Sequence, residues 1–202
     1  MGHLAIRQVM SRAELAKSDS DFTHFFALLL AGEALAKLVV LGMVASIADD
    51  KDRNRYRLEH QLVRADGVGD WGRALEDALV GPASQFLVVD ARREQNELTK
   101  PCKAEDWQHV VTKKLSLALD ALGIDSEEVP VKTDLRRWFR LFATLRNKSR
   151  GHGATMSLKA AAAAPLIGES VKIFTENFSL FSRQWAYLHR KALLHKPCPP
   201  NC

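Results

Sequence analysis

The sequence predicts an all-α protein, folded as a helical bundle of about six to eight helices. Apolar residues recur at helical spacing through most of the 202 residues, and polar breaks with capping residues, glycine or proline separate the apolar segments. No segment shows the alternation of apolar and polar residues that is typical of a half-buried strand. The hydrophobic fraction of 47% is enough for a core. We therefore expect residues 1–195 to form one domain, followed by a disordered tail at 196–202.

The first half of the chain predicts a short helix over residues 4–17 and a long one over about 21–48. The long helix is apolar nearly all round, so it is expected in the middle of the bundle. It is not expected to cross a membrane, because Glu33 and Lys37 interrupt it and the uncharged run that follows is shorter than the ~18 residues a span needs.

Further helices are predicted over residues 56–63, 71–80, about 82–99 and 107–122, with Pro82 and Pro101 bounding the third of these. Another is expected to start at Thr133 or Asp134, because both residue types suit a helix N-terminus. Five apolar residues recur at helical spacing and form its predicted buried face: Leu135, Trp138, Phe139, Phe142 and Leu145. A last helix is predicted to open at Pro165 and to run to about Leu194.

Composition gives limited information about function. The formal net charge of +5 modestly favours an anionic partner. Three widely spaced cysteines, Cys102, Cys198 and Cys202, indicate neither a disulfide framework nor a metal site, which suits a reducing cytoplasm. Charged residues interrupt every apolar run near the N-terminus, so no signal peptide is predicted. We expect a cytoplasmic protein without a metal or cofactor.

The segment 146–153, Arg-Asn-Lys-Ser-Arg-Gly-His-Gly, carries the strongest functional signal. Arginine is a permanent planar cation suited to phosphate oxygens, and histidine changes its charge nearest neutral pH. Together they suit phosphodiester chemistry without a metal. The alternative is structural, because cations and glycine commonly end helices where the dipole is negative.

Six cations and no acid lie between residues 136 and 150, which is unusual for a purely structural helix. A bound anion would neutralise them, but acids from other helices could do the same. Glu33 is the most interesting candidate for that role, because it lies in the apolar helix and needs a partner there.

Arg146-Asn147, followed by four residues and His152, resembles the R-x(4–6)-H signature of HEPN domains, which often has Asn after the arginine. HEPN domains are all-α bundles that carry this signature at the end of a late helix. The segment 28–37, which contains Glu33, is similar to the early HEPN helix whose acidic or amide residue faces the motif. The resemblance covers the architecture of most of the chain, but only these two short segments in sequence.

The resemblance implies a metal-independent endoribonuclease that cleaves single-stranded RNA and leaves a 2′,3′-cyclic phosphate. His152 would act as general base or acid, and Arg146 would stabilise charge on the scissile phosphate. Asn147 would orient one of these two side chains. Arg140, Lys148 and Arg150 would bind flanking phosphates. Glu33 would support Arg146.

HEPN ribonucleases dimerise with both motifs facing one cleft, so the resemblance implies a symmetric homodimer with its axis near Arg146 and His152. It also implies a toxin or antiviral-defence effector, with a possible antitoxin, regulatory partner or regulatory domain. Two alternatives stay open: a non-catalytic HEPN module that binds RNA, a nucleotide or a partner protein, and a plain helical interaction domain. Under the enzymatic interpretation, replacing Arg146 or His152 by alanine is expected to reduce cleavage by orders of magnitude with little change in melting temperature.

Overall fold

The structure, a computed structural model, describes residues 4–48, 51–151 and 157–183, and the side chains of Arg150 and Gly151 are not described. In these residues the chain forms eight α-helices, three short 3₁₀ helices and no strand, so the predicted all-α class is confirmed. The helices are α1 (Leu4–Ala16), α2 (Asp21–Ala45), α3 (Asn54–Val63), α4 (Val68–Val80), α5 (Arg92–Thr99), α6 (Trp107–Ala121), α7 (Arg136–Gly151) and α8 (Ser157–Asn177). The 3₁₀ helices are η1 (Pro82–Phe86), η2 (Val89–Ala91) and η3 (Ser179–Ser182).

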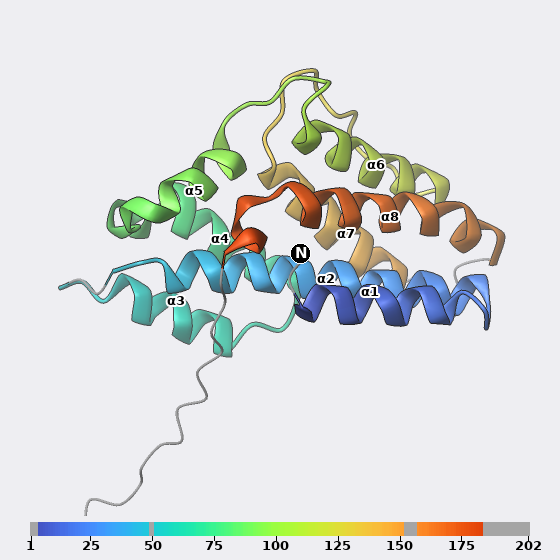
Figure 1. The fold of residues 1–202 in the computed structure, drawn as a ribbon, viewed down its shortest axis with the longest axis horizontal. Helices are drawn as coiled ribbons and strands as arrows, with labels where there is room; N and C mark the ends of the chain where they lie inside the picture. Colours follow the sequence, from blue (N-terminus) through green and yellow to red (C-terminus); the bar gives the residue numbers. More distant parts are fainter. Residues whose placement is uncertain (1–3, 49–50, 152–156, 184–202) are drawn as a thin grey trace, which may run out of the picture.

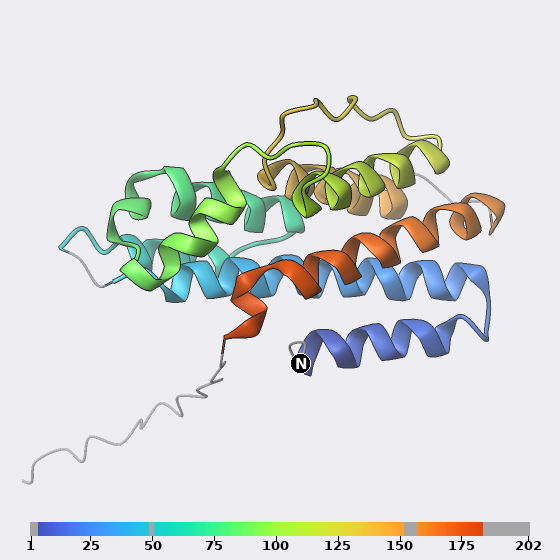
Figure 2. The same ribbon diagram turned by 45° about the horizontal axis from the view of Figure 1, so that its top comes forward.

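Helix α2 is the centre of the bundle. It contacts α1, α8 and α4 extensively and touches α3 and α7 (Figures 1 and 2). Its apolar residues point in nearly all directions, and most of them are buried because neighbours cover the helix on several sides. By length and composition α2 could cross a membrane, but most of its apolar stretch is buried inside the bundle. The core helix of a helical bundle commonly has this length and composition.

The predicted buried face of the motif helix is confirmed. All five predicted side chains are at most 4% exposed. The Trp138 ring stacks on Phe142 with the centroids 5.1 Å apart, and its indole Nε1 donates to Ser170 Oγ of α8 at 2.8 Å. Ser170 in turn donates to the Val111 carbonyl of α6 at 2.9 Å. This buried chain of hydrogen bonds ties α6, α7 and α8 together, and it fixes the direction in which α7 leaves the core.

Two predicted helix boundaries are wrong. The expected helix over 82–99 is interrupted, because Leu87 forms an isolated bridge with Ile47 and the Val88 amide donates to the Ser46 carbonyl at 2.9 Å. Burial of Leu87 against the end of α2 therefore outweighs local helix propensity. Likewise, Pro165 does not open the last helix but lies inside α8. Alanines flank it on one side, and Ala163, Ala164 and Ile167 are buried, so packing offsets the hydrogen bond that proline cannot make.

The ends of α7 and α8 also differ from the prediction. Helix α7 begins at Arg136 rather than at Thr133 or Asp134, and Asp134 instead accepts the Arg136 amide at 3.0 Å in front of the first turn. Helix α8 ends at Asn177, and η3 follows it. The rest of the expected last helix and the predicted 196–202 tail lie outside the described residues.

Candidate functional site

The C-terminal part of α7 carries the candidate site. Arg146 is buried, with its side chain only 7% exposed, whereas the neighbouring Asn147 and Lys148 are exposed. The difference follows from the helical repeat, because residue 146 continues the face formed by Phe139 and Phe142 while residues 147 and 148 turn outward. His152 lies outside the described residues, as does the side chain of Arg150.

The expected pairing of Arg146 with Glu33 is present. Arg146 Nε donates to Glu33 Oε2 at 2.8 Å, which joins two residues 113 positions apart in the sequence. The other oxygen of Glu33, Oε1, accepts from Lys37 Nζ at 2.8 Å. Lys37 Nζ also lies over the Trp71 ring of α4, 5.4 Å from its centroid. The four side chains form a polar network across α2, α4 and α7.

The close approach of α7 to α2 depends on Gly32, the residue before Glu33. A Cβ atom at this position would lie 2.3 Å from Cε2 of the buried Phe142 ring, far inside van der Waals contact. Only glycine lets the Phe142 ring lie against the backbone of α2. Because Gly32 lets α2 and α7 approach each other closely, it also allows Glu33 and Arg146 to come within hydrogen-bonding distance.

Electrostatics keep Glu33 ionised. Burial alone would raise its pKa, but the hydrogen bonds from Lys37 and Arg146 outweigh burial, and the pKa of Glu33 falls below its ordinary value. An ionised Glu33 holds the Arg146 guanidinium in one orientation through a charge-assisted hydrogen bond.

Arg146 nevertheless keeps unused hydrogen-bonding capacity. Its Nη1 atom is buried and has no hydrogen-bond partner among the described residues. A buried donor without a partner costs about 1–3 kcal/mol, so its persistence calls for an explanation such as a bound anion.

The other cations of α7 are mostly neutralised from within the chain. Arg136 pairs with Asp134 at 2.6 Å and with Glu76 at 3.1 Å, and Arg137 pairs with Glu127 at 3.2 Å. Arg140, a predicted RNA-binding residue, lies 3.9 Å from Glu76 with 65% of its side chain exposed. In the first half of α7, acidic residues from other parts of the chain therefore neutralise the cations, as one of the two interpretations of the sequence predicted. Lys148 is exposed and makes no ion pair within the described part of the chain.

Among the predicted site residues, the structure brings Glu33 and Arg146 together, with Asn147 and Lys148 beside them on the surface. Sequence reasoning missed Lys37 and Trp71, which complete the network around Glu33. The i,i+4 spacing of Glu33 and Lys37 was a usable signal for the first of these. Nothing in the sequence points to Trp71. Over residues 4–48, 51–151 and 157–183, no group of three or more His, Cys, Asp and Glu side chains is arranged to hold a metal ion.

A comparison with known protein families found no family model that matches the chain, and comparisons with curated proteins and with solved structures found no match either.

Proposed function

We propose that this chain is a metal-independent endoribonuclease of the HEPN type, acting on single-stranded RNA as a homodimer in the cytoplasm. One observation carries the proposal. Arg146 is buried at the end of α7 and oriented by Glu33, yet one of its donor atoms has no partner among the described residues, and His152 follows six residues later in the sequence. A phosphate oxygen would satisfy that donor.

The proposed reaction uses the ribose 2′-hydroxyl as nucleophile. A histidine takes its proton, the 2′-oxygen attacks phosphorus, and the 5′-oxygen leaves with a proton from a second acid. The products are a 2′,3′-cyclic phosphate and a 5′-hydroxyl. Arg146 would stabilise the negative charge that builds up on the phosphoryl oxygens, a contribution typically worth about 10²–10³-fold in rate.

The dimer would supply the second acid, because each chain contributes one His152. The solvent-facing stripe of α2 supports this arrangement. Phe26 and Ala34 on this stripe are half-buried, while Leu30 and Leu41 are about half exposed, at 53% and 42%. Leu30 lies one turn from Glu33, so a second copy packed along this stripe would lie next to the Arg146 network.

The test is incubation of the purified protein with single-stranded RNA in EDTA, beside His152→Ala and the matched control His60→Ala, which alters an exposed histidine on α3. We expect cyclic-phosphate ends with the wild type and with His60→Ala, and none with His152→Ala. Equal cleavage by all three proteins would point to a contaminating nuclease and contradict the proposal.

The dimer is tested with Leu30→Glu, which puts a charge on the α2 stripe, against Leu15→Glu, which changes a more exposed leucine on α1. Glutamate and leucine have similar helix propensities, so the fold should tolerate both. Light scattering should show a monomer only for Leu30→Glu, together with lost cleavage. A monomeric wild type that cleaves RNA would contradict the composite site.

A non-catalytic module that binds RNA, a nucleotide or a protein is the second candidate. The ion pairs of Arg136 and Arg137 favour it, since they leave fewer free cations on α7 than the sequence alone indicates. Binding of RNA without cleavage, unaffected by His152→Ala, is the result that would support it. A role as a toxin or defence effector, with an antitoxin or regulator, rests on the resemblance alone.

A further inference from the structure

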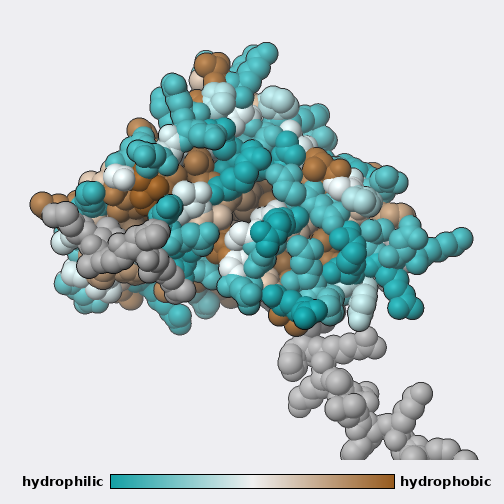
Figure 3. Space-filling view, turned by 180° about the vertical axis from the view of Figure 1, so that it is seen from behind, coloured by the Kyte–Doolittle hydropathy of each residue, from teal (hydrophilic) through white to brown (hydrophobic). Residues whose placement is uncertain are grey.

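A groove of about 360 Å³ lies between α4 and α7. Its floor is apolar and is formed by the buried Leu75 and Phe139, together with Ala143. Gly69 and Gly72 form the α4 wall, and the charged residues Arg73, Glu76, Arg136 and Arg140 surround the floor. In Figure 1, α8 and α2 pass in front of these helices, and Figure 3 shows the opposite face, with apolar surface bordered by hydrophilic side chains.

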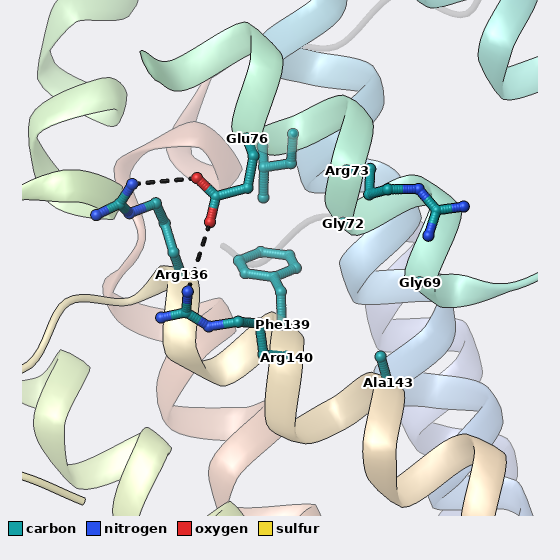
Figure 4. Close-up of a pocket in the computed structure, with 9 residues that line it drawn as sticks. Gly69, Gly72, Arg73, Glu76, Arg136, Phe139, Arg140 and Ala143 are labelled. Carbon is teal, nitrogen blue, oxygen red and sulfur yellow. Dashed lines mark hydrogen bonds and ion pairs between the residues drawn. The ribbon is translucent and has the colours of Figure 1, made fainter. Parts of the chain in front are cut away.

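The acid of this groove, Glu76, is paired with cations of α7. Glu76 is held between two arginines, with Oε2 3.1 Å from Arg136 and Oε1 3.9 Å from Arg140 (Figure 4). Arg73 points outward from α4, away from Glu76, and also pairs with Asp70 on its own helix. The side chains of Arg73 and Arg140 are 73% and 65% exposed, so both guanidinium groups are accessible to a ligand.

This arrangement matches the chemistry of a nucleotide. A groove of this size with an apolar floor suits the flat face of a base, and exposed arginines suit phosphate oxygens. An ionised carboxylate only accepts hydrogen bonds, so Glu76 suits the amino group of adenine, cytosine or guanine. Uracil has no amino group and offers only its ring N–H. Arg136 holds Glu76 in place through the oxygen Oε2, while the other oxygen, Oε1, faces Arg140.

The groove and the candidate site lie on the same two helices, α4 and α7. Arg136, Arg140, Ala143 and Asn147 repeat at intervals of three and four residues, so they lie along one stripe of α7 that runs from the groove to the residue after Arg146. On α4, Trp71 adjoins Gly72 in sequence and joins the Lys37–Glu33–Arg146 network.

We propose that the α4/α7 groove binds a nucleotide of the RNA strand next to the scissile phosphate, with the base on the floor beside Glu76 and the flanking phosphates on Arg73 and Arg140. This assignment rests on the proposed ribonuclease function. It makes Arg73 and Glu76 binding residues and gives the enzyme a preference for bases that carry an amino group. Gly72 makes no contact with the base in this assignment and only leaves the space above the floor open.

Gly72 provides the sharpest test. A Cβ atom there meets nothing within 4 Å, so a larger side chain projects into the groove without disturbing the core. The probe is a fluorescein-labelled 2′-O-methyl oligoadenylate, which has no free 2′-hydroxyl and cannot be cleaved. Fluorescence anisotropy measures its binding to the full chain. We expect Gly72→Leu to weaken binding by about ten-fold or more, the loss typical for one stacked base, with an unchanged or higher melting temperature. The control Gly72→Ala leaves most of the groove open and should bind within about two-fold of the wild type.

The phosphate contacts are tested with Arg73→Ala against Arg93→Ala. Both arginines are 73% exposed and each pairs with an acid on its own helix, but Arg93 lies on α5, away from the groove. Arg73→Ala should weaken binding and reduce the slope of log affinity against log salt by about 0.7, the value for one phosphate of a single strand. Arg93→Ala should change neither. An oligouridylate probe should bind wild type more weakly than oligoadenylate, and Glu76→Gln should reduce that difference.

The outcomes separate this inference from the proposed function. If the wild type cleaves RNA but Gly72→Leu and Arg73→Ala bind like the wild type, the groove assignment is wrong and the ribonuclease stands. If the wild type binds RNA without cleaving it, and both variants bind RNA more weakly than the wild type, the groove binds RNA and the proposed ribonuclease activity is wrong. An absence of RNA binding by the wild type overturns both.

Discussion

Two arginine–glutamate pairs in this protein have the same chemistry, but they differ in how many hydrogen bonds the two partners make. At the end of the described chain, Arg183 donates to both oxygens of Glu94, at 2.7 and 2.8 Å, and also to the Asp90 carbonyl. Glu94, only 1% exposed, accepts a further hydrogen bond from Ser179 Oγ at 3.0 Å. Arg146 instead uses one nitrogen toward Glu33 and leaves Nη1 buried without a partner within the described residues.

The difference separates a structural pair from a candidate functional one. In the Arg183–Glu94 pair, both carboxylate oxygens accept hydrogen bonds, and Ser179 links η3 to the same carboxylate on α5. This pair therefore has little capacity left to bind a ligand. A buried guanidinium with a vacant donor is costly unless something binds it. The locations agree with this interpretation, because only the second pair involves α7, the helix that also forms one wall of the groove.

The largest expected effect is on stability. Glu33→Ala should lower the free energy of unfolding by about 3–5 kcal/mol, because Arg146, 7% exposed, is left buried without its counter-charge. Glu94→Ala should cost less, about 1–2 kcal/mol, because Arg183 is 40% exposed and can return to water. Urea denaturation of both variants measures the difference. Equal losses would mean that burial of the arginine does not distinguish the two pairs.

The next effect is on activity. The burial of Arg146 changes the expectation that Arg146→Ala would leave the melting temperature nearly unchanged, so Arg146→Lys, which keeps the charge, is the better variant. Lysine cannot present the planar donors, and kcat should fall by about 10²–10³-fold. Arg183→Lys, the matched change in the saturated pair, should leave kcat unchanged. Comparable losses in kcat for both variants would show that the effect is indirect.

A smaller effect is expected from glycine. Gly32→Ala should destabilise the protein by about 1–3 kcal/mol, because the new methyl group would overlap the Phe142 ring and push α7 away from α2. Gly72→Ala meets open space and should instead add about 0.5–1 kcal/mol through helix propensity. Thermal melting compares the two. If Gly32→Ala also stabilises the protein, the close approach of α2 and α7 does not set the Glu33–Arg146 contact.

The smallest effect is on pH dependence. The pKa of Glu33 is lowered in the folded state, so its stabilising contribution is complete above its ordinary value of 4.5 and is lost as the pH falls through the lowered value. Glu33→Gln cannot titrate there. The difference in unfolding free energy between wild type and Glu33→Gln should therefore shrink between pH 7 and the acid range. A constant difference would show that the Arg146 and Lys37 contacts do not depend on the Glu33 charge.

Local patterns in the sequence were enough for several features of the fold and site. The period of Trp138, Phe142 and Leu145 predicted the buried face of α7, because helical geometry alone decides which residues share a face. The same reasoning suggested Glu33 as a partner for the basic helix, since a carboxylate in an apolar helix requires one. Pro165 and the 82–99 segment were predicted wrongly, because the packing that overrides propensity at these places involves residues distant in sequence.

The sequence by itself determined the helical class, the central place of the apolar helix and the position of the basic segment, because each depends on spacing within one segment. Only the tertiary structure decided which acids the arginines of α7 contact. Glu76 and Glu33 lie 60 and 113 positions from the arginines they contact, and no local pattern fixes such distances. The groove between α4 and α7 likewise exists only once two separate helices are packed, because its walls come from both.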